Sequence, residues 1–139
     1  MALFTKKYII DADNSLSYGQ ASSNFKKVLK LLGIAPPIIK RTAIAMYEAE
    51  INTIIHGGGG TAQVVIEDDH IKIMFEDHGP GIADIEQAMQ VGYSTASHKV
   101  REMGFGAGLG LPNIQKNVSE LKIDSTPGKG TKVTIRIAL

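Results

Sequence analysis

The stretch GFGAGLGL, residues 104–111, has a glycine at every second position and no charged side chain. Loops this rich in glycine usually bring the backbone close to a ligand. The residues that follow predict a helix over 109–121, with Pro112 in its first turn. Free N–H groups at a helix N-terminus can hold an anion without a lysine. From this stretch alone, an anion cradle and a flexible linker that ends in a glycine N-cap are equally good interpretations.

Three known phosphate-binding loops do not fit this stretch. A Walker A loop needs Gly-Lys-Ser or Gly-Lys-Thr, whereas the chain's single Gly-Lys pair, Gly128-Lys129, is followed by Gly130. A dinucleotide fingerprint needs GxGxxG, and counting from Gly104 or Gly106 puts leucine at the sixth position. The glycine loop of a protein kinase precedes its catalytic residues, whereas this stretch lies near the C-terminus.

The composition of the chain excludes several classes of function. With 139 residues, 43% of them hydrophobic, the chain is expected to form one domain with a real core. A net charge of +1 gives no case for nucleic acid or an anionic membrane as partner. The absence of cysteine excludes a disulfide scaffold, a thiolate zinc site and a cysteine nucleophile. We expect a cytoplasmic location, because no signal peptide or apolar run of about 18 residues is present.

Hydrophobic periodicity predicts an α+β fold. The expected order is strand, two helices, a strand hairpin, a short helix, an irregular loop, a helix and a second hairpin. Because hairpins and helices are segregated, we expect a two-layer sandwich with helices on one face of a mixed β-sheet, as a single domain over 1–139. The expected strands are 5–11, 61–68, 70–77, 122–126 and 131–139. The expected helices are 16–32, 38–56, 83–90 and 109–121, with the loop at 91–108.

Two polar residues stand out on the second predicted helix. Glu48 and Asn52 are four positions apart and therefore share a face. Their neighbours are largely apolar, and buried polar groups are costly unless they are satisfied. An Asn carbonyl can supply one oxygen to Mg²⁺, with phosphates and water supplying the others. The alternative is a solvated stripe of an amphipathic helix, to which we assign Glu50.

The segment DHGPGI, residues 77–82, follows an apolar strand. The carboxylate of Asp77 can accept a hydrogen bond from an amine in a half-buried pocket, and Gly79 and Gly81 would let a flat ring approach the backbone. An ordinary turn after a strand remains the alternative for these residues.

Together these segments resemble the GHKL ATPase superfamily, which has the Bergerat ATP-binding fold of gyrase and histidine kinases. The resemblance covers about residues 38–138. It has the N-box at 48–52 and glycine boxes at 77–82, 104–111 and 128–131, in the order of the family. The chain is most similar to bacterial anti-sigma-factor and switch-protein serine/threonine kinases. Sensor histidine kinases usually carry Asn in place of Glu48 and have a phosphoacceptor helical hairpin, which we do not expect in this chain.

The resemblance implies a role for each matching residue. Glu48 would be the catalytic base, and Asn52 would coordinate Mg²⁺ between the phosphates. Asp77 would bind the adenine amino group. Four residues would line or support the base pocket: Gly79, Gly81, Ile82 and Thr131. Six residues would contact phosphate: Arg101, Gly104, Gly106, Gly108, Leu109 and Gly110.

The resemblance also implies an ATP lid over about residues 91–108. Arg101 is the preferred γ-phosphate contact on this lid, ahead of His98 and Lys99, because a guanidinium matches phosphate oxygens. A solvated basic loop is the alternative for all three. We expect structural rather than catalytic roles for His56 and His78.

The implied function is that of an ATP- and Mg²⁺-dependent serine/threonine kinase in a partner-switching pathway. Its substrate would be a small STAS-type antagonist protein, and such kinases often also bind a sigma factor; a homodimer is left open. A second hypothesis is a nucleotide-dependent module that sequesters a partner with little kinase activity. A third is a stand-alone catalytic domain of a histidine kinase, which Glu48 disfavours.

Overall fold

The computed structural model describes residues 2–82, 85, 89 and 110–139. The predicted helix over 83–90 and loop over 91–108 therefore lie outside the described residues, except for positions 85 and 89. Within the described part, none of the helices is both long and apolar enough to cross a bilayer. The elements are β1 (Phe4–Ile10), α1 (Gln20–Leu31), α2 (Pro36–Ile55), β2 (Gly60–Ile66), β3 (His70–Asp77), α5 (Gly110–Asn117), β4 (Glu120–Thr126) and β5 (Gly130–Ala138).

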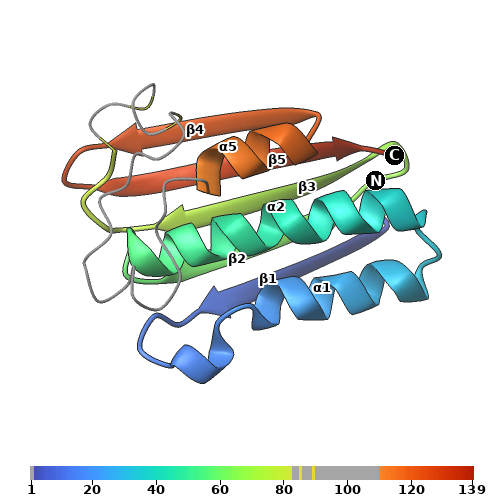
Figure 1. Cartoon of the computed structure of the whole chain (residues 1–139), viewed down its shortest axis with the longest axis horizontal. Coiled ribbons are helices and arrows are strands. Elements are labelled where there is room, and N and C mark those ends of the chain that lie inside the picture. Colours follow the sequence, from blue (N-terminus) through green and yellow to red (C-terminus); the bar gives the residue numbers. More distant parts are fainter. Residues whose placement is uncertain (1, 83–84, 86–88, 90–109) are drawn as a thin grey trace.

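The five strands form one sheet in the order β1-β2-β3-β5-β4. The three α-helices of the described residues lie on one face of it, with α2 between α1 and α5 (Figure 1). The expected α+β class is confirmed, but the expectation of a mixed sheet is wrong, because every neighbouring pair of these strands is antiparallel. A single helix between two strands usually makes the second strand run parallel to the first. Two helices, α1 and α2, lie between β1 and β2, so β2 runs antiparallel to β1.

The core lies between the helices and the three central strands. Side chains alternate along each strand, so every second residue faces the helices. The register aligns these residues into rows that cross the sheet, and α2 packs against them with the buried Ala45 and Met46. The three rows are Ala62–Phe75–Val133, Val64–Ile73–Ile135 and Ile66–Ile71–Ile137.

Glu50 is not part of a solvated stripe, because it is only 2% exposed. Its carboxylate accepts hydrogen bonds from the N–H groups of Gly19 (2.9 Å) and Ser22 (3.0 Å) and from the Ser22 hydroxyl (2.6 Å). The N-cap of α1 is Gly19, which has no side chain to satisfy the first turn of the helix. Glu50 therefore caps α1 from the neighbouring helix α2.

Two predicted helices are shorter than expected. At the first, residues 15–17 form a separate one-turn 3₁₀ helix capped by Asn14, and α1 begins only after Gly19, whose φ is +85°. At the second, α5 ends at Asn117 because the next residues join the sheet. Ser119 donates its N–H to the carbonyl of Arg136 (2.9 Å).

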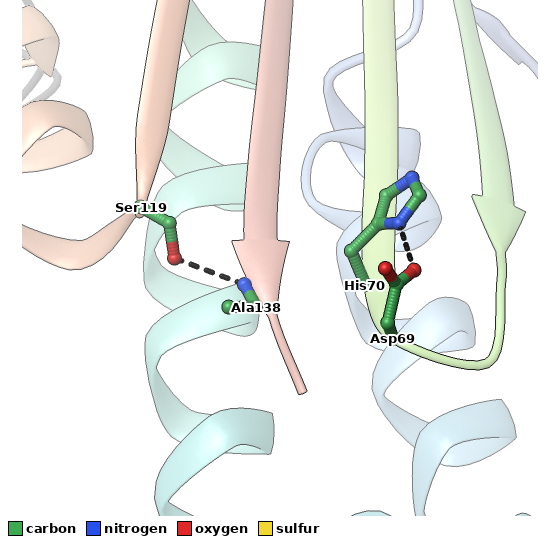
Figure 2. Close-up of polar contacts among 4 residues, drawn as sticks. All are labelled: Asp69, His70, Ser119 and Ala138. Carbon is green, nitrogen blue, oxygen red and sulfur yellow. Dashed lines mark hydrogen bonds and ion pairs between the residues drawn. The ribbon is translucent and has the colours of Figure 1, made fainter.

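The end of the sheet that holds Ser119 is shown in Figure 2. The Ser119 hydroxyl accepts the N–H of Ala138 at 2.9 Å, and Asp69 contacts the ring of His70 at 2.6 Å in the β2–β3 turn. This is the opposite end from Asp77, the last residue of β3.

We predict that Glu50→Ala lowers the free energy of unfolding by about 3 kcal/mol, since it leaves buried N–H groups of α1 without an acceptor. Urea denaturation followed by circular dichroism measures the loss. Glu120→Ala, at an exposed position on β4, is the matched control and should change stability by less than about 0.5 kcal/mol. Equal losses in the two variants would contradict the capping role.

Candidate nucleotide-binding site

Three polar residues form a row across the end of the sheet. Asp77 on β3 is the register partner of Thr131 on β5, which in turn is the partner of Ser125 on β4. They continue the alternation of the buried Phe75 and Val133, so they lie on the face that the helices cover. The hydroxyls of Ser125 and Thr131 are 2.8 Å apart. This row forms the floor of the candidate site.

The carboxylate of Asp77 lies directly against the backbone of Gly57. A Cβ at Gly57 would be 2.6 Å from Asp77 Oδ2, and one at Gly79 would be 2.8 Å from the Cα of Gly57. Asp77 Oδ1 accepts the N–H of Gly79 at 2.9 Å. Glycine is therefore required at both positions, and Oδ2 is the carboxylate oxygen that we expect to accept a hydrogen bond from a ligand amine.

The loop that follows β3 is hydrogen-bonded to β4 and to the β4–β5 turn. Gly128 donates its N–H to the carbonyl of Pro80 at 2.7 Å, and Ile82 donates its N–H to the hydroxyl of Ser125 at 2.6 Å. Between them Gly81 has a φ of +77°, a left-handed conformation that favours glycine. The first and last glycine boxes therefore form one structural unit.

The two polar residues of the N-box face the start of α5. A Cβ at Gly110 would lie 2.9 Å from Asn52 Oδ1, so the first residue of α5 packs directly on this carboxamide. The side chain of Glu48, one turn earlier on α2, forms a hydrogen bond with the side chain of Asn113. A helix N-terminus favours negative charge, so the place where these residues meet suits phosphate.

The environment of Glu48 favours proton uptake. Burial raises the pKa of its carboxyl group above the usual range, and the hydrogen bond from Asn113 opposes that rise. A carboxylate with a raised pKa is better matched to accepting a proton near neutral pH. Asn113 was not among the residues that the sequence indicated. Its signal was weak: a polar residue three positions after Gly110, hence on the same helix face.

His56 lies at the C-terminal end of α2, close to Asp77. Burial lowers the pKa of its imidazole below the usual value, and the negative charge of Asp77 opposes that shift.

The structure brings most of the indicated residues into one region. Asn52 lies in the last turn of α2 and Gly57 comes two residues after the helix ends, so the N-box and the Asp77 pocket lie at the same end of the helix. The indicated residues that are described there are Glu48, Asn52, Asp77, Gly79, Gly81, Ile82, Gly110 and Thr131. Those that lie outside the described residues are Arg101, Gly104, Gly106, Gly108 and Leu109, together with the lid over 91–108.

Known proteins match this chain at the level of family and of individual relatives. The family model described as histidine kinase-, DNA gyrase B-, and HSP90-like ATPase matches residues 39–139. An anti-sigma F factor of Thermoanaerobacter sp. (strain X514) is 42% identical over 94 residues, which cover 64% of this chain and 62% of the relative. The serine/threonine-protein kinase RsbT of Bacillus subtilis is 31% identical over 112 residues, which cover 78% of each chain. The match thus spans less than two thirds of the anti-sigma F factor.

A solved structure shares the fold. A chain in the SiaB–SiaC complex from Pseudomonas aeruginosa superposes with a TM-score of 0.57, covering 99% of this chain and 91% of that one. The sequences are 13% identical, so the likeness shows the fold alone.

We predict that Gly57→Ala weakens ATP binding by about tenfold or more, since the added Cβ must displace the Asp77 carboxylate. Isothermal titration calorimetry measures the affinity. Gly58→Asn is the matched control: Gly58 has a φ of +73° and open space around it, and asparagine tolerates that conformation. The control should bind as the wild type does, and unchanged binding by Gly57→Ala would contradict the proposed pocket.

We predict that Asn113→Leu raises the pKa of Glu48 further, because burial then acts on the carboxyl group without the opposing hydrogen bond. Carbon-13 NMR titration of the Glu48 carboxyl measures this pKa. Asn117→Leu is the control on the same helix, because the Asn117 side chain bonds the backbone carbonyl of Asn113. A pKa that falls or stays constant in Asn113→Leu would show that this contact does not stabilise the charged carboxylate.

Proposed function

Because the chain belongs to the histidine kinase-, DNA gyrase B- and HSP90-like ATPase family, we propose that it binds ATP with Mg²⁺ and phosphorylates a serine or threonine of a small partner protein. One observation carries the proposal: Glu48 and Asn52, one turn apart on α2, both contact the first turn of α5. The Glu48 carboxylate is hydrogen-bonded to Asn113, and the Asn52 carboxamide packs on Gly110. A base beside a phosphate site is what transfer to a hydroxyl requires.

The base pocket is formed by the row at the end of the sheet. Asp77 Oδ2 would accept a hydrogen bond from the adenine amino group, and Thr131 would contact the base by its hydroxyl, directly or through water. The loop after β3 carries glycine at 79 and 81, so the flat ring can approach the backbone there. Its fastening to the β4–β5 turn supports a preformed pocket.

Asn52 is suited to holding Mg²⁺ together with the phosphates. Its carboxamide packs against Gly110 at the N-terminus of α5, and an amide oxygen is a ligand that Mg²⁺ accepts. When bound, the ion would neutralise phosphate charge, a task for which the glycine loop carries no lysine. The N–H groups of the first turn of α5 would add to that neutralisation.

Glu48 would act on the acceptor hydroxyl. Its carboxylate would take the hydroxyl proton while the oxygen bonds to the γ-phosphorus and the bond to the ADP oxygen breaks. Asn113 would hold the carboxylate in position. The raised pKa of Glu48 supports this role, because a carboxylate with a raised pKa accepts a proton more readily.

The names of the relatives support a regulatory substrate, since they are an anti-sigma F factor and a serine/threonine-protein kinase. We propose a STAS-type antagonist as the phosphorylated partner and a sigma factor as a second target. The anti-sigma name also supports the alternative of a module that sequesters its partner with little kinase activity.

The deciding experiment incubates the protein with radiolabelled ATP, Mg²⁺ and a purified STAS-type protein from the same organism, and then maps the labelled residue. Phosphoserine or phosphothreonine supports the kinase. Phosphohistidine would instead indicate a histidine-kinase-type domain, and an unlabelled partner would indicate a binding module.

We predict that Glu48→Gln retains ATP affinity but lowers the rate of phosphotransfer by about 100-fold or more, since glutamine cannot accept the proton. Calorimetry and single-turnover labelling measure the two quantities. Glu120→Gln is the matched control at an exposed position. Labelling by Glu48→Gln at the wild-type rate would rule out the role as base.

A further inference from the structure

We propose that Ser125 determines base specificity in the nucleotide site, by fixing the direction in which the Thr131 hydroxyl presents its proton. The inference rests on the proposed binding of ATP. It assigns a role to a residue outside the glycine boxes, at the edge of the pocket floor.

Ser125 is placed to control Thr131 by the pairing of the strands. The two residues are register partners on β4 and β5, and Thr131 is also the partner of Asp77. Ser125 Oγ lies 2.8 Å from Thr131 Oγ1 and 3.2 Å from the carbonyl oxygen of Gly130. It also accepts the N–H of Ile82 at 2.6 Å. One hydroxyl therefore contacts three groups around the pocket.

Counting protons limits the directions that this bond can take. A serine hydroxyl has one proton and two lone pairs, and the N–H of Ile82 occupies one of those lone pairs. The proton can go to Thr131 or to the carbonyl of Gly130, and either hydroxyl of the 2.8 Å pair could be its donor. We assign the Ser125 proton to Thr131, because 2.8 Å is the usual O–H···O distance and the 3.2 Å to Gly130 is long. Thr131 then accepts from Ser125, so its own proton is free to be donated into the pocket.

This arrangement distinguishes two purines. Adenine presents an amino donor next to a ring-nitrogen acceptor, whereas guanine presents a carbonyl acceptor next to an N–H donor. Asp77 as acceptor and Thr131 as donor match adenine and oppose guanine at both positions. Sites that leave buried polar groups unpaired discriminate strongly against the wrong ligand. Without Ser125, the Thr131 hydroxyl can rotate to accept from guanine, and half of the discrimination is lost.

Ser125 also holds the loop that carries Gly79 and Gly81. Its bond to Ile82 is one of two fastenings of this loop, the other being the bond from Gly128 to Pro80. Loss of the serine hydroxyl therefore loosens one wall of the pocket as well as freeing Thr131.

The test compares Ser125→Ala with Ser119→Ala. Both variants remove a hydroxyl that accepts a backbone N–H on the β4–β5 side of the sheet, and Ser119 lies at the opposite end (Figure 2). Calorimetry gives the dissociation constants for ATP and GTP, each with Mg²⁺. Ser125→Ala should weaken ATP binding by about tenfold and reduce the preference for ATP over GTP by about tenfold or more. Ser119→Ala should change neither value by more than about twofold.

A double-mutant cycle with Thr131→Val separates the relay from general loosening. Because Ser125 acts through Thr131, the double variant should show no lower preference for ATP than Thr131→Val alone. Should Ser125→Ala fail to fold, Ser125→Cys replaces it with the same expectation, since a thiol is a weak donor and acceptor. A wild-type preference in the Ser125 variant overturns this proposal while leaving ATP binding intact. Wild-type protein that binds neither nucleotide overturns the proposed function itself.

Discussion

The register between β3, β5 and β4 is the constraint on which the site depends. It places Asp77 beside Thr131 and Ser125, although Asp77 belongs to another hairpin than these two residues. A slip of β5 by one residue would turn Thr131 to the uncovered face, away from Asp77. The register is fixed by the buried rows behind them, such as Phe75 against Val133, because a slip would also expose those side chains. Core packing and the geometry of the candidate site are thus set by the same pairing.

The spacing of apolar and polar residues predicted those features that depend only on residues close together in the sequence. Alternation predicted the β2–β3 hairpin, and the four-residue spacing correctly placed Glu48 and Asn52 on one helix face. The structure adds that this face lies toward α5. Glu50 could not be predicted in this way. It is buried because its donors, on Gly19 and Ser22, lie 31 and 28 positions earlier in the chain. A charged residue looks solvated in sequence until its partner is known.

The direction of β2 and the contacts of Asn113 and Gly57 differ in the same way. The antiparallel direction of β2 against β1 follows from the two helices between them, so it was available from the predicted order of elements. The contact of Asn113 with Glu48 was not, since it exists only where α5 packs on α2. The role of Gly57 was likewise hidden, because its reason is the position of Asp77, 20 residues later in the chain.

Residues close together on α2 and just after it contact different elements of the fold, and this restricts how the segment can change in evolution. Glu48 faces α5, Glu50 caps α1, and Gly57 follows the helix where it meets Asp77. Inserting or deleting one residue among them would rotate everything beyond it by about 100°. No single substitution could restore all three contacts after such a change. The length of the segment from 48 to 57 is therefore as strictly constrained as its composition, and homologues with this site should keep that spacing even where their loops vary.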